Sequence, residues 1–161
     1  MAPTTKKRFA VLAGIVIVGV TAGVAAQAAT TGSAPINRFD AVDEIVEECT
    51  NTTNFNVMPQ MKRSFTVAGS VAEEAVVMFE GSLSLSDSGG FDTGFLRLTV
   101  DGVEQSPGLI PTLAEGDRGT HGFNWHTTPL SPGSHTARIQ WRTDLGETFC
   151  ADARSLIVIH K

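Results

Sequence analysis

From Arg63 onward, short stretches of alternating apolar and polar residues are separated by glycine, proline and aspartate. Alternation with a period of two puts successive side chains on opposite faces of a β-strand, whereas a helix repeats every 3.6 residues. The clearest stretch spans residues 137–142, where alanine, isoleucine and tryptophan alternate with arginine and glutamine. Almost no long helical period competes with this pattern, so it restricts the chain to an all-β fold.

The turns between these stretches indicate how the strands connect. Asp101-Gly102 predicts a type I′ hairpin, because both central residues of that turn need a positive φ. Pro132 and Gly133 suit the two central positions of a type II turn. About eight short strands separated by such turns predict an antiparallel β-sandwich or β-barrel. We assign this single domain to residues 40–161.

The N-terminus has the pattern of a secretory signal peptide. Lys6, Lys7 and Arg8 precede an apolar stretch over residues 9–26, and Ala26-Gln27-Ala28 offers a small-x-small cleavage site. An uncleaved membrane anchor is the alternative, but the stretch is slightly short for a span and no charged stop follows it. We therefore predict a signal peptide at residues 1–28 and a flexible linker at 29–39.

Removal of this leader makes the remaining domain more acidic. The leader holds three of the twelve lysines and arginines and no acid, so the net charge changes from −5 to −8. Neutralising phosphates requires clustered Lys and Arg, which this domain lacks overall. We expect no nucleic acid partner, no docking to anionic lipid and no membrane span after cleavage. The protein is predicted to be extracellular, either secreted freely or held at the cell envelope.

The two cysteines, Cys49 and Cys150, predict one disulfide bond, since an even count in an exported chain favours pairing. The bond would tie the N-terminal segment to a late strand. That segment, residues 40–49, carries five acids around three apolar residues. Its spacing suits either a short helix or an extended strand, and its charges suit a solvated face.

Five short motifs mark turns and core positions: Val100-Asp101-Gly102-Val103, Gly122-Phe123-Asn124-Trp125, Pro132-Gly133-Ser134-His135-Thr136, Gln140-Trp141-Arg142 and Ala153-Arg154-Ser155-Leu156. They resemble those of small exported β-sandwich proteins from high-GC Gram-positive bacteria, most of which have no assigned function. The arrangement is also similar to jelly-roll modules related to tumour-necrosis-factor-like and phage-fibre head domains. The resemblance covers roughly residues 63–160. It implies an antiparallel β-sandwich of jelly-roll type and does not imply catalytic residues.

Catalytic and transition-metal signatures are weak. The four histidines lack the His-x-His or His-x-x-x-His spacing typical of zinc ligands, so surface or strand-end positions are the simpler interpretation. Ser131, Ser134 and His135 lie close together, but no Gly-x-Ser-x-Gly elbow accompanies them. Both tryptophans are expected in the core. A metal-dependent or serine hydrolase is therefore the third-ranked hypothesis.

Two other sets of residues are candidate binding sites. Asp87, Asp92 and Asp101 offer oxygen ligands of the kind calcium takes, although turn formation also explains aspartates at these places. The outward row of the 137–142 strand offers groups that bind carboxylates or hydroxyls. This candidate ligand surface consists of Arg138, Gln140 and Arg142.

These observations favour a secreted, non-catalytic binding or surface module for an extracellular glycan or protein. No cofactor is expected apart from a structural calcium ion. The second hypothesis is a structural envelope or extracellular protein that self-associates, for example as a trimer.

Overall fold

The computed structural model describes residues 38–86, 89–114 and 116–161. The predicted signal peptide, residues 29–37 of the predicted linker and Asp87 lie outside these residues. The described chain forms ten strands and no helix, so no helix within it could span a bilayer. The strands are β1 (Arg38–Glu44), β2 (Glu48–Thr50), β3 (Asn56–Val67), β4 (Val76–Leu85), β5 (Thr93–Val100), β6 (Val103–Glu104), β7 (Ile110–Ala114), β8 (Arg118–His126), β9 (Gly133–Thr143) and β10 (Phe149–His160).

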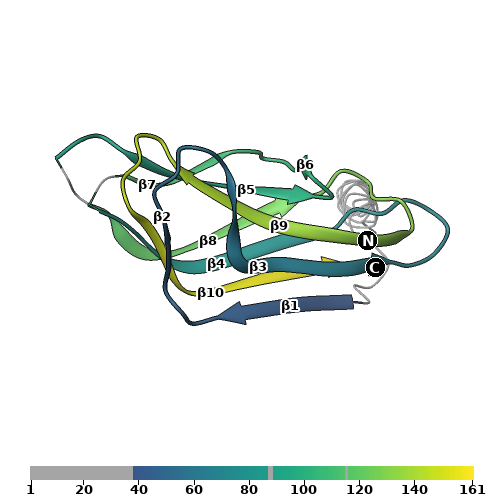
Figure 1. Cartoon of the computed structure of the whole chain (residues 1–161). Coiled ribbons are helices and arrows are strands. Elements are labelled where there is room, and N and C mark those ends of the chain that lie inside the picture. The colour runs from purple at the N-terminus through teal and green to yellow at the C-terminus, as the bar shows by residue number, and fades with distance from the viewer. Residues whose placement is uncertain (1–37, 87–88, 115) are drawn as a thin grey trace, which may run out of the picture. The chain divides into compact units, whose positions relative to one another are not determined.

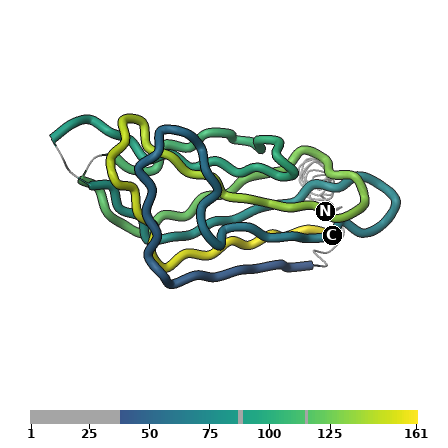
Figure 2. Tube along the Cα trace, in the orientation of Figure 1, coloured from purple at the N-terminus to yellow at the C-terminus, as the bar shows by residue number. Residues whose placement is uncertain are grey.

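Two antiparallel sheets pack against each other (Figure 1), which confirms the predicted β-sandwich. The first sheet has the order β1-β10-β4-β8, and β2 also pairs with β10. The second sheet has the order β3-β9-β5-β6, and β7 also pairs with β5. Neighbouring strands are mostly distant in sequence. Figure 2 shows this for β1 and β10, which lie side by side although they come from opposite ends of the described chain.

Residues 40–44 and 48–49 lie in the strands β1 and β2, which resolves the choice that their spacing left open. β1 pairs with β10 from Arg38 opposite His160 to Glu44 opposite Arg154. The strand includes Arg38 and Phe39, which lie within the linker that the sequence predicts. Long pairing with a central strand of the first sheet outweighs the weak helical spacing of this segment.

The core lies between the sheets and follows the predicted alternation. In β9, Ala137, Ile139 and Trp141 are fully buried, and Trp125 of β8 lies opposite Val77 of β4 in the same core. Burying an aromatic side chain of this size stabilises the fold by about 1.5–3 kcal/mol. The alternation in the sequence therefore predicted the direction of these side chains correctly.

The predicted hairpin and the predicted disulfide are both present. Asp101 and Gly102 have φ values of 50° and 88°, as a type I′ turn between β5 and β6 requires. Cys49 of β2 lies directly opposite Cys150 of β10, and their Cα atoms are 4.0 Å apart. The bond closes a sequence separation of 101 residues.

Candidate functional site

The predicted ligand row lies on the outer face of the second sheet. Arg138, Gln140 and Arg142 of β9 are half-buried and point away from the core. β9 is flanked by β3 and β5, so side chains from three strands surround this row. We call this surface the arginine face, and it comprises Phe55, Lys62, Phe95, Arg97, Arg138, Gln140 and Arg142.

Two guanidinium groups on the arginine face are held against aromatic rings. The Arg97 guanidinium lies 4.0 Å from the centre of the Phe55 ring. The Arg142 guanidinium lies 4.5 Å from the centre of the Phe95 ring and 5.3 Å from that of Phe55. Cation–π contacts of this kind contribute about 0.5–1 kcal/mol at exposed sites. They hold both guanidinium groups close to these rings.

Polar neighbours complete the environment of both arginines. Arg97 donates to Gln140 Oε1 at 2.8 Å and to Glu104 Oε2 at 2.9 Å. Arg142 donates to the Thr143 carbonyl and to Asp144 Oδ1, both at 3.0 Å. Two of the three predicted residues, Gln140 and Arg142, are therefore already engaged within the protein.

Arg138 is in a different situation. It lies directly opposite Lys62 of β3 in the register of the sheet. Neither side chain forms a hydrogen bond or an ion pair with the residues that the structure describes, although the charge of Arg138 helps to lower the pKa of Asp101. Like charges directly opposite each other destabilise an antiparallel pair. Lys62, Arg97 and the two phenylalanines were absent from the predicted surface, because the sequence does not show which strands flank β9.

The outer face of the first sheet is hollowed. Three hollows of about 220, 340 and 520 Å³ follow one another along β4. Met78 and Glu80 line the first, Glu80 and Ser82 the second, and Ser84 and Ser86 the third. We call this feature the β4 groove.

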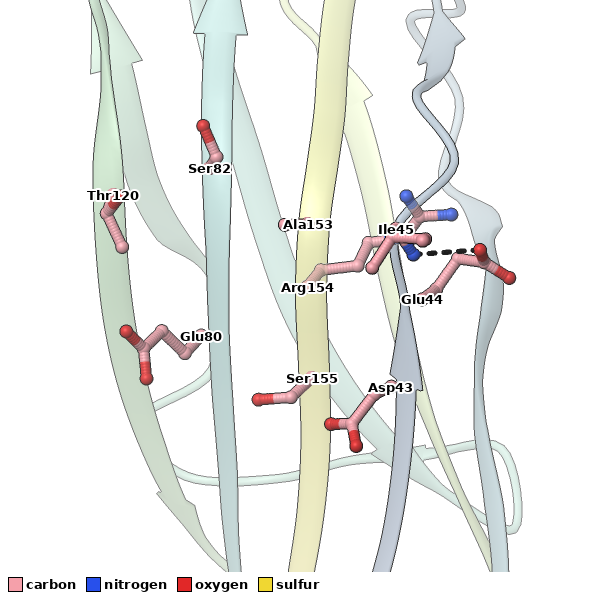
Figure 3. Close-up of a pocket in the computed structure, with 9 residues that line it drawn as sticks. All are labelled: Asp43, Glu44, Ile45, Glu80, Ser82, Thr120, Ala153, Arg154 and Ser155. Carbon is pink, nitrogen blue, oxygen red and sulfur yellow. Dashed lines mark hydrogen bonds between the residues drawn. The ribbon is translucent and has the colours of Figure 1, made fainter.

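Figure 3 shows the middle hollow from outside the sheet. Side chains from four neighbouring strands lie side by side across it: Thr120 of β8, Glu80 and Ser82 of β4, Ser155 of β10 and Asp43 of β1. Hydroxyl and carboxylate oxygens thus line the hollow. The sequence does not single out these residues, because serines and threonines on a solvated strand face are common.

Two of the three candidate calcium ligands, Asp92 and Asp101, lie apart in the described part of the chain. Asp92 precedes β5 and Asp101 follows it, so the two carboxylates lie at opposite ends of an eight-residue strand. Asp92 is buried and accepts hydrogen bonds from the backbone amides of Thr93, Asp144, Leu145 and Glu147. Burial alone would raise its pKa, but these four amides outweigh burial and lower it. Asp92 therefore organises the turn before β10.

Asp101 is likewise occupied, by residues of β9. It accepts a hydrogen bond from the Thr136 amide at 2.8 Å, and its Oδ2 lies 2.7 Å from His135 Nδ1. His135 Nε2 lies 2.7 Å from the Ser131 carbonyl oxygen. A carbonyl and a carboxylate only accept, so both imidazole nitrogens donate and the ring is cationic. This arrangement leaves His135 no free nitrogen with which to activate the hydroxyl of Ser131 or Ser134.

The other histidines do not gather at one site. His121 and His126 lie on β8, whereas His160 is buried at the end of β10 with Nε2 3.1 Å from Asp40 Oδ2. Across the described ranges, the one group spaced like a set of metal ligands combines Glu47 with the two disulfide-bonded cysteines. Oxidised sulfurs are not thiolate ligands, so this group is not a metal site.

No family model matches the chain, and neither does any curated protein. Solved structures do match. The infectious bursal disease virus VP2 subviral particle aligns with 76% of this chain at 11% identity and a TM-score of 0.51, and this chain covers 32% of that one. The chain thus spans about a third of the VP2 chain that it matches.

Two carbohydrate-related structures are also similar. The C-terminal domain of EclA, a sugar-binding protein, aligns with 78% of this chain and 83% of its own at 13% identity and a TM-score of 0.41. The CBM36-1 domain of a multidomain xylanase from the hindgut metagenome of Trinervitermes trinervoides aligns with 70% of this chain and 96% of its own. Its identity is 11% and its TM-score 0.36. The likeness to VP2 shows a shared fold alone, and the expected relation to exported Gram-positive proteins stays a prediction.

Proposed function

We propose that the protein is an extracellular, non-catalytic binding module that holds an acidic glycan by its carboxylate on the arginine face. The opposed side chains of Lys62 and Arg138 carry this proposal. Two adjacent cations with no carboxylate between them repel each other, and an anionic group placed between them would relieve that repulsion. The disulfide bond supports the extracellular location.

The surroundings of this pair favour a single carboxylate over a long polyanion. Arg97 and Arg142 are partly neutralised by Glu104 and Asp144, which also border the face. These acids would repel a run of closely spaced negative charges. The fixed guanidinium groups beside them can donate to hydroxyl groups of the same sugar.

The proposal is tested by calorimetric titration with trigalacturonate and with its methyl ester. We expect the acid to bind and the ester to bind much more weakly. Lys62→Gln and Arg138→Gln should each lower the affinity for trigalacturonate about tenfold, because a hydrogen bond to a charged group contributes about 1.5–3 kcal/mol. The loss should diminish at high salt.

Arg38→Gln is the matched control, since Arg38 is an exposed cation on the first sheet. Its affinity for trigalacturonate should equal that of the wild type. Equal binding of the ester, or an equal loss in Arg38→Gln, would refute the assignment of the carboxylate to Lys62 and Arg138.

Self-association is the second candidate function, and exposed apolar side chains on the first sheet favour it. Phe39 is 64% exposed and Met78 37% exposed. Ile159 lies opposite Phe39, and Ile157 lies opposite Met78. An assembly that buries these residues would appear in light scattering as a trimer or larger particle, and Phe39→Ser would return it to a monomer.

A further inference from the structure

Gly122 lies at an exposed position in the middle of β8, where no neighbouring atom excludes a side chain. Glycine weakens a strand, and it often marks a bulge, a bend, or a place where a ligand or another backbone approaches closely. The pairing of β8 with β4 has no register shift at Gly122, so a bulge does not account for it. A Cβ atom at Gly122 would meet only the Phe79 carbonyl oxygen, at 3.9 Å, which is an ordinary contact. Its φ lies outside the left-handed region that favours glycine.

Two other strand glycines show what a packing reason looks like. A Cβ at Gly81 would lie 2.9 Å from Phe79 Cζ, and one at Gly94 would lie 3.1 Å from Phe149 Cε1. Both glycines face the core and leave room for these rings. Gly122 instead lies opposite Glu80 on the outer face and lines the first hollow of the β4 groove. The missing side chain keeps the groove open.

The β4 groove offers both apolar contacts and hydrogen-bonding groups. These complement the two kinds of surface on a sugar chain. A pyranose ring has an apolar face of C–H groups and a rim of hydroxyl groups. Met78 and Ile157 supply apolar contacts in the first hollow, and Glu80, Ser82 and Thr120 supply hydrogen-bonding oxygens in the second. Binding sites typically pair apolar area with a few well-placed polar groups in this way.

The length and charge of the groove further restrict which ligands can bind. From Met78 to Leu85, where β4 ends, the strand extends about 23 Å at its usual rise per residue, so the three hollows accommodate several sugar units. Asp43 and Glu80 both face the middle hollow and would repel a carboxylated sugar. We infer that the β4 groove is a second binding site, for a neutral oligosaccharide, on the sheet opposite the arginine face.

The decisive variant is Gly122→Val, which places a branched side chain in the groove. Because valine suits a strand better than glycine and the position is open, its melting temperature should equal or exceed that of the wild type. Binding of cello-, manno- and xylo-oligosaccharides is then measured by calorimetry. For the wild type we expect binding in at least one series, with an affinity that rises from the disaccharide to the hexasaccharide. Gly122→Val should weaken it about tenfold or more.

Thr66→Val is the matched control, because it places the same side chain on an exposed position of β3 in the second sheet. It should bind the oligosaccharides as the wild type does, and so should Arg138→Gln. Gly122→Val should in turn keep the affinity for trigalacturonate. The inference is overturned if no neutral series binds at millimolar concentration, or if Gly122→Val binds as well as the wild type. Loss of neutral-sugar binding in Arg138→Gln alone would place the ligand on the arginine face instead.

Discussion

His135 illustrates how a single side chain can resemble a catalytic group and yet be structural. It lies beside two serines and an aspartate, but the Ser131 carbonyl and the Asp101 carboxylate occupy both ring nitrogens. Burial alone would lower the pKa of His135, but the hydrogen bonds to Ser131 and Asp101 outweigh burial and raise the pKa above 6.5. The same contact helps to lower the pKa of Asp101, against the effect of its burial. The pair is an internal ion pair that fixes the hairpin to β9.

The free energy of unfolding should therefore depend on pH through His135. A histidine whose pKa is raised on folding contributes its full stabilisation below the unfolded-state pKa. That contribution is lost as pH rises through the folded-state pKa. His135→Gln should cost about 1–2 kcal/mol at pH 5.5 and less at pH 9, measured by urea denaturation.

His126→Gln is the control for this measurement, since His126 is exposed on β8. It should leave the pH profile between 5.5 and 9 unchanged. If the free energies of unfolding of the wild type and of His135→Gln changed in parallel with pH over this range, that result would contradict the assigned ion pair.

At the scale of the elements, local patterns predicted the strands and the hairpin but not their neighbours. The alternation of residues 137–142 identified the inward and outward sides of β9 because period-two patterning depends only on the strand itself. The position of β9 between β3 and β5 depends on packing between distant segments, which no local pattern encodes. The residues of the arginine face were therefore predicted only in part, because the sequence indicated Arg138 as an outward residue but not that Lys62 lies opposite it.

The positions at which strand pairing becomes irregular could not be predicted from the sequence either. The register of β10 on β4 shifts between Ala151 and Arg154, and that of β3 on β9 shifts between Val57 and Lys62. β-Bulges insert residues without a composition of their own, so alternation alone cannot locate them. The β4 groove was missed for a related reason, because its shape results from small side chains contributed by separate strands.

The short strand β2 should depend on the disulfide bond for its place on β10. β2 has three residues, and Cys49 is the central one. Replacing both cysteines with serine should lower the free energy of unfolding by up to about 4 kcal/mol, because the bond closes a separation of 101 residues. Amide exchange in β2 should accelerate more than in β4.

Reduction of the wild type provides the control for these substitutions, and its urea midpoint should match that of the double variant. An unchanged midpoint in both would show that the pairing of β2 with β10 does not need the covalent bond.

At the scale of the whole molecule, one buried cation connects the two sheets. Arg154 of β10 is 3% exposed. Its Nη1 donates to the Val46 and Ala151 carbonyls at 2.7 and 3.0 Å, and its Nη2 donates to the Pro59 carbonyl of β3 at 3.2 Å. Burial lowers the pKa of Arg154, although the charges of nearby acids oppose that shift. The guanidinium thus satisfies carbonyl groups at the β10 and β3 bulges together.

Arg154→Met should destabilise the protein by about 3–5 kcal/mol, because several buried carbonyl groups lose their donor at once. Arg154→Lys keeps the charge but has a single donor atom, so it should recover only part of the loss. Urea denaturation of both variants measures the difference. A lysine variant as stable as the wild type would show that charge, and not the fork of the guanidinium, holds the sheets together.

The outer faces of two stacked sheets point in opposite directions, which limits what a molecule built this way can connect. A domain with one polymer-binding site on each side can bind two polymer chains, as a bifunctional monomer can form two bonds. It joins chains in pairs, and because the core separates the sites, occupancy of one leaves the other accessible. It cannot by itself be a branch point, so a network made with it would take its branching from the polymers.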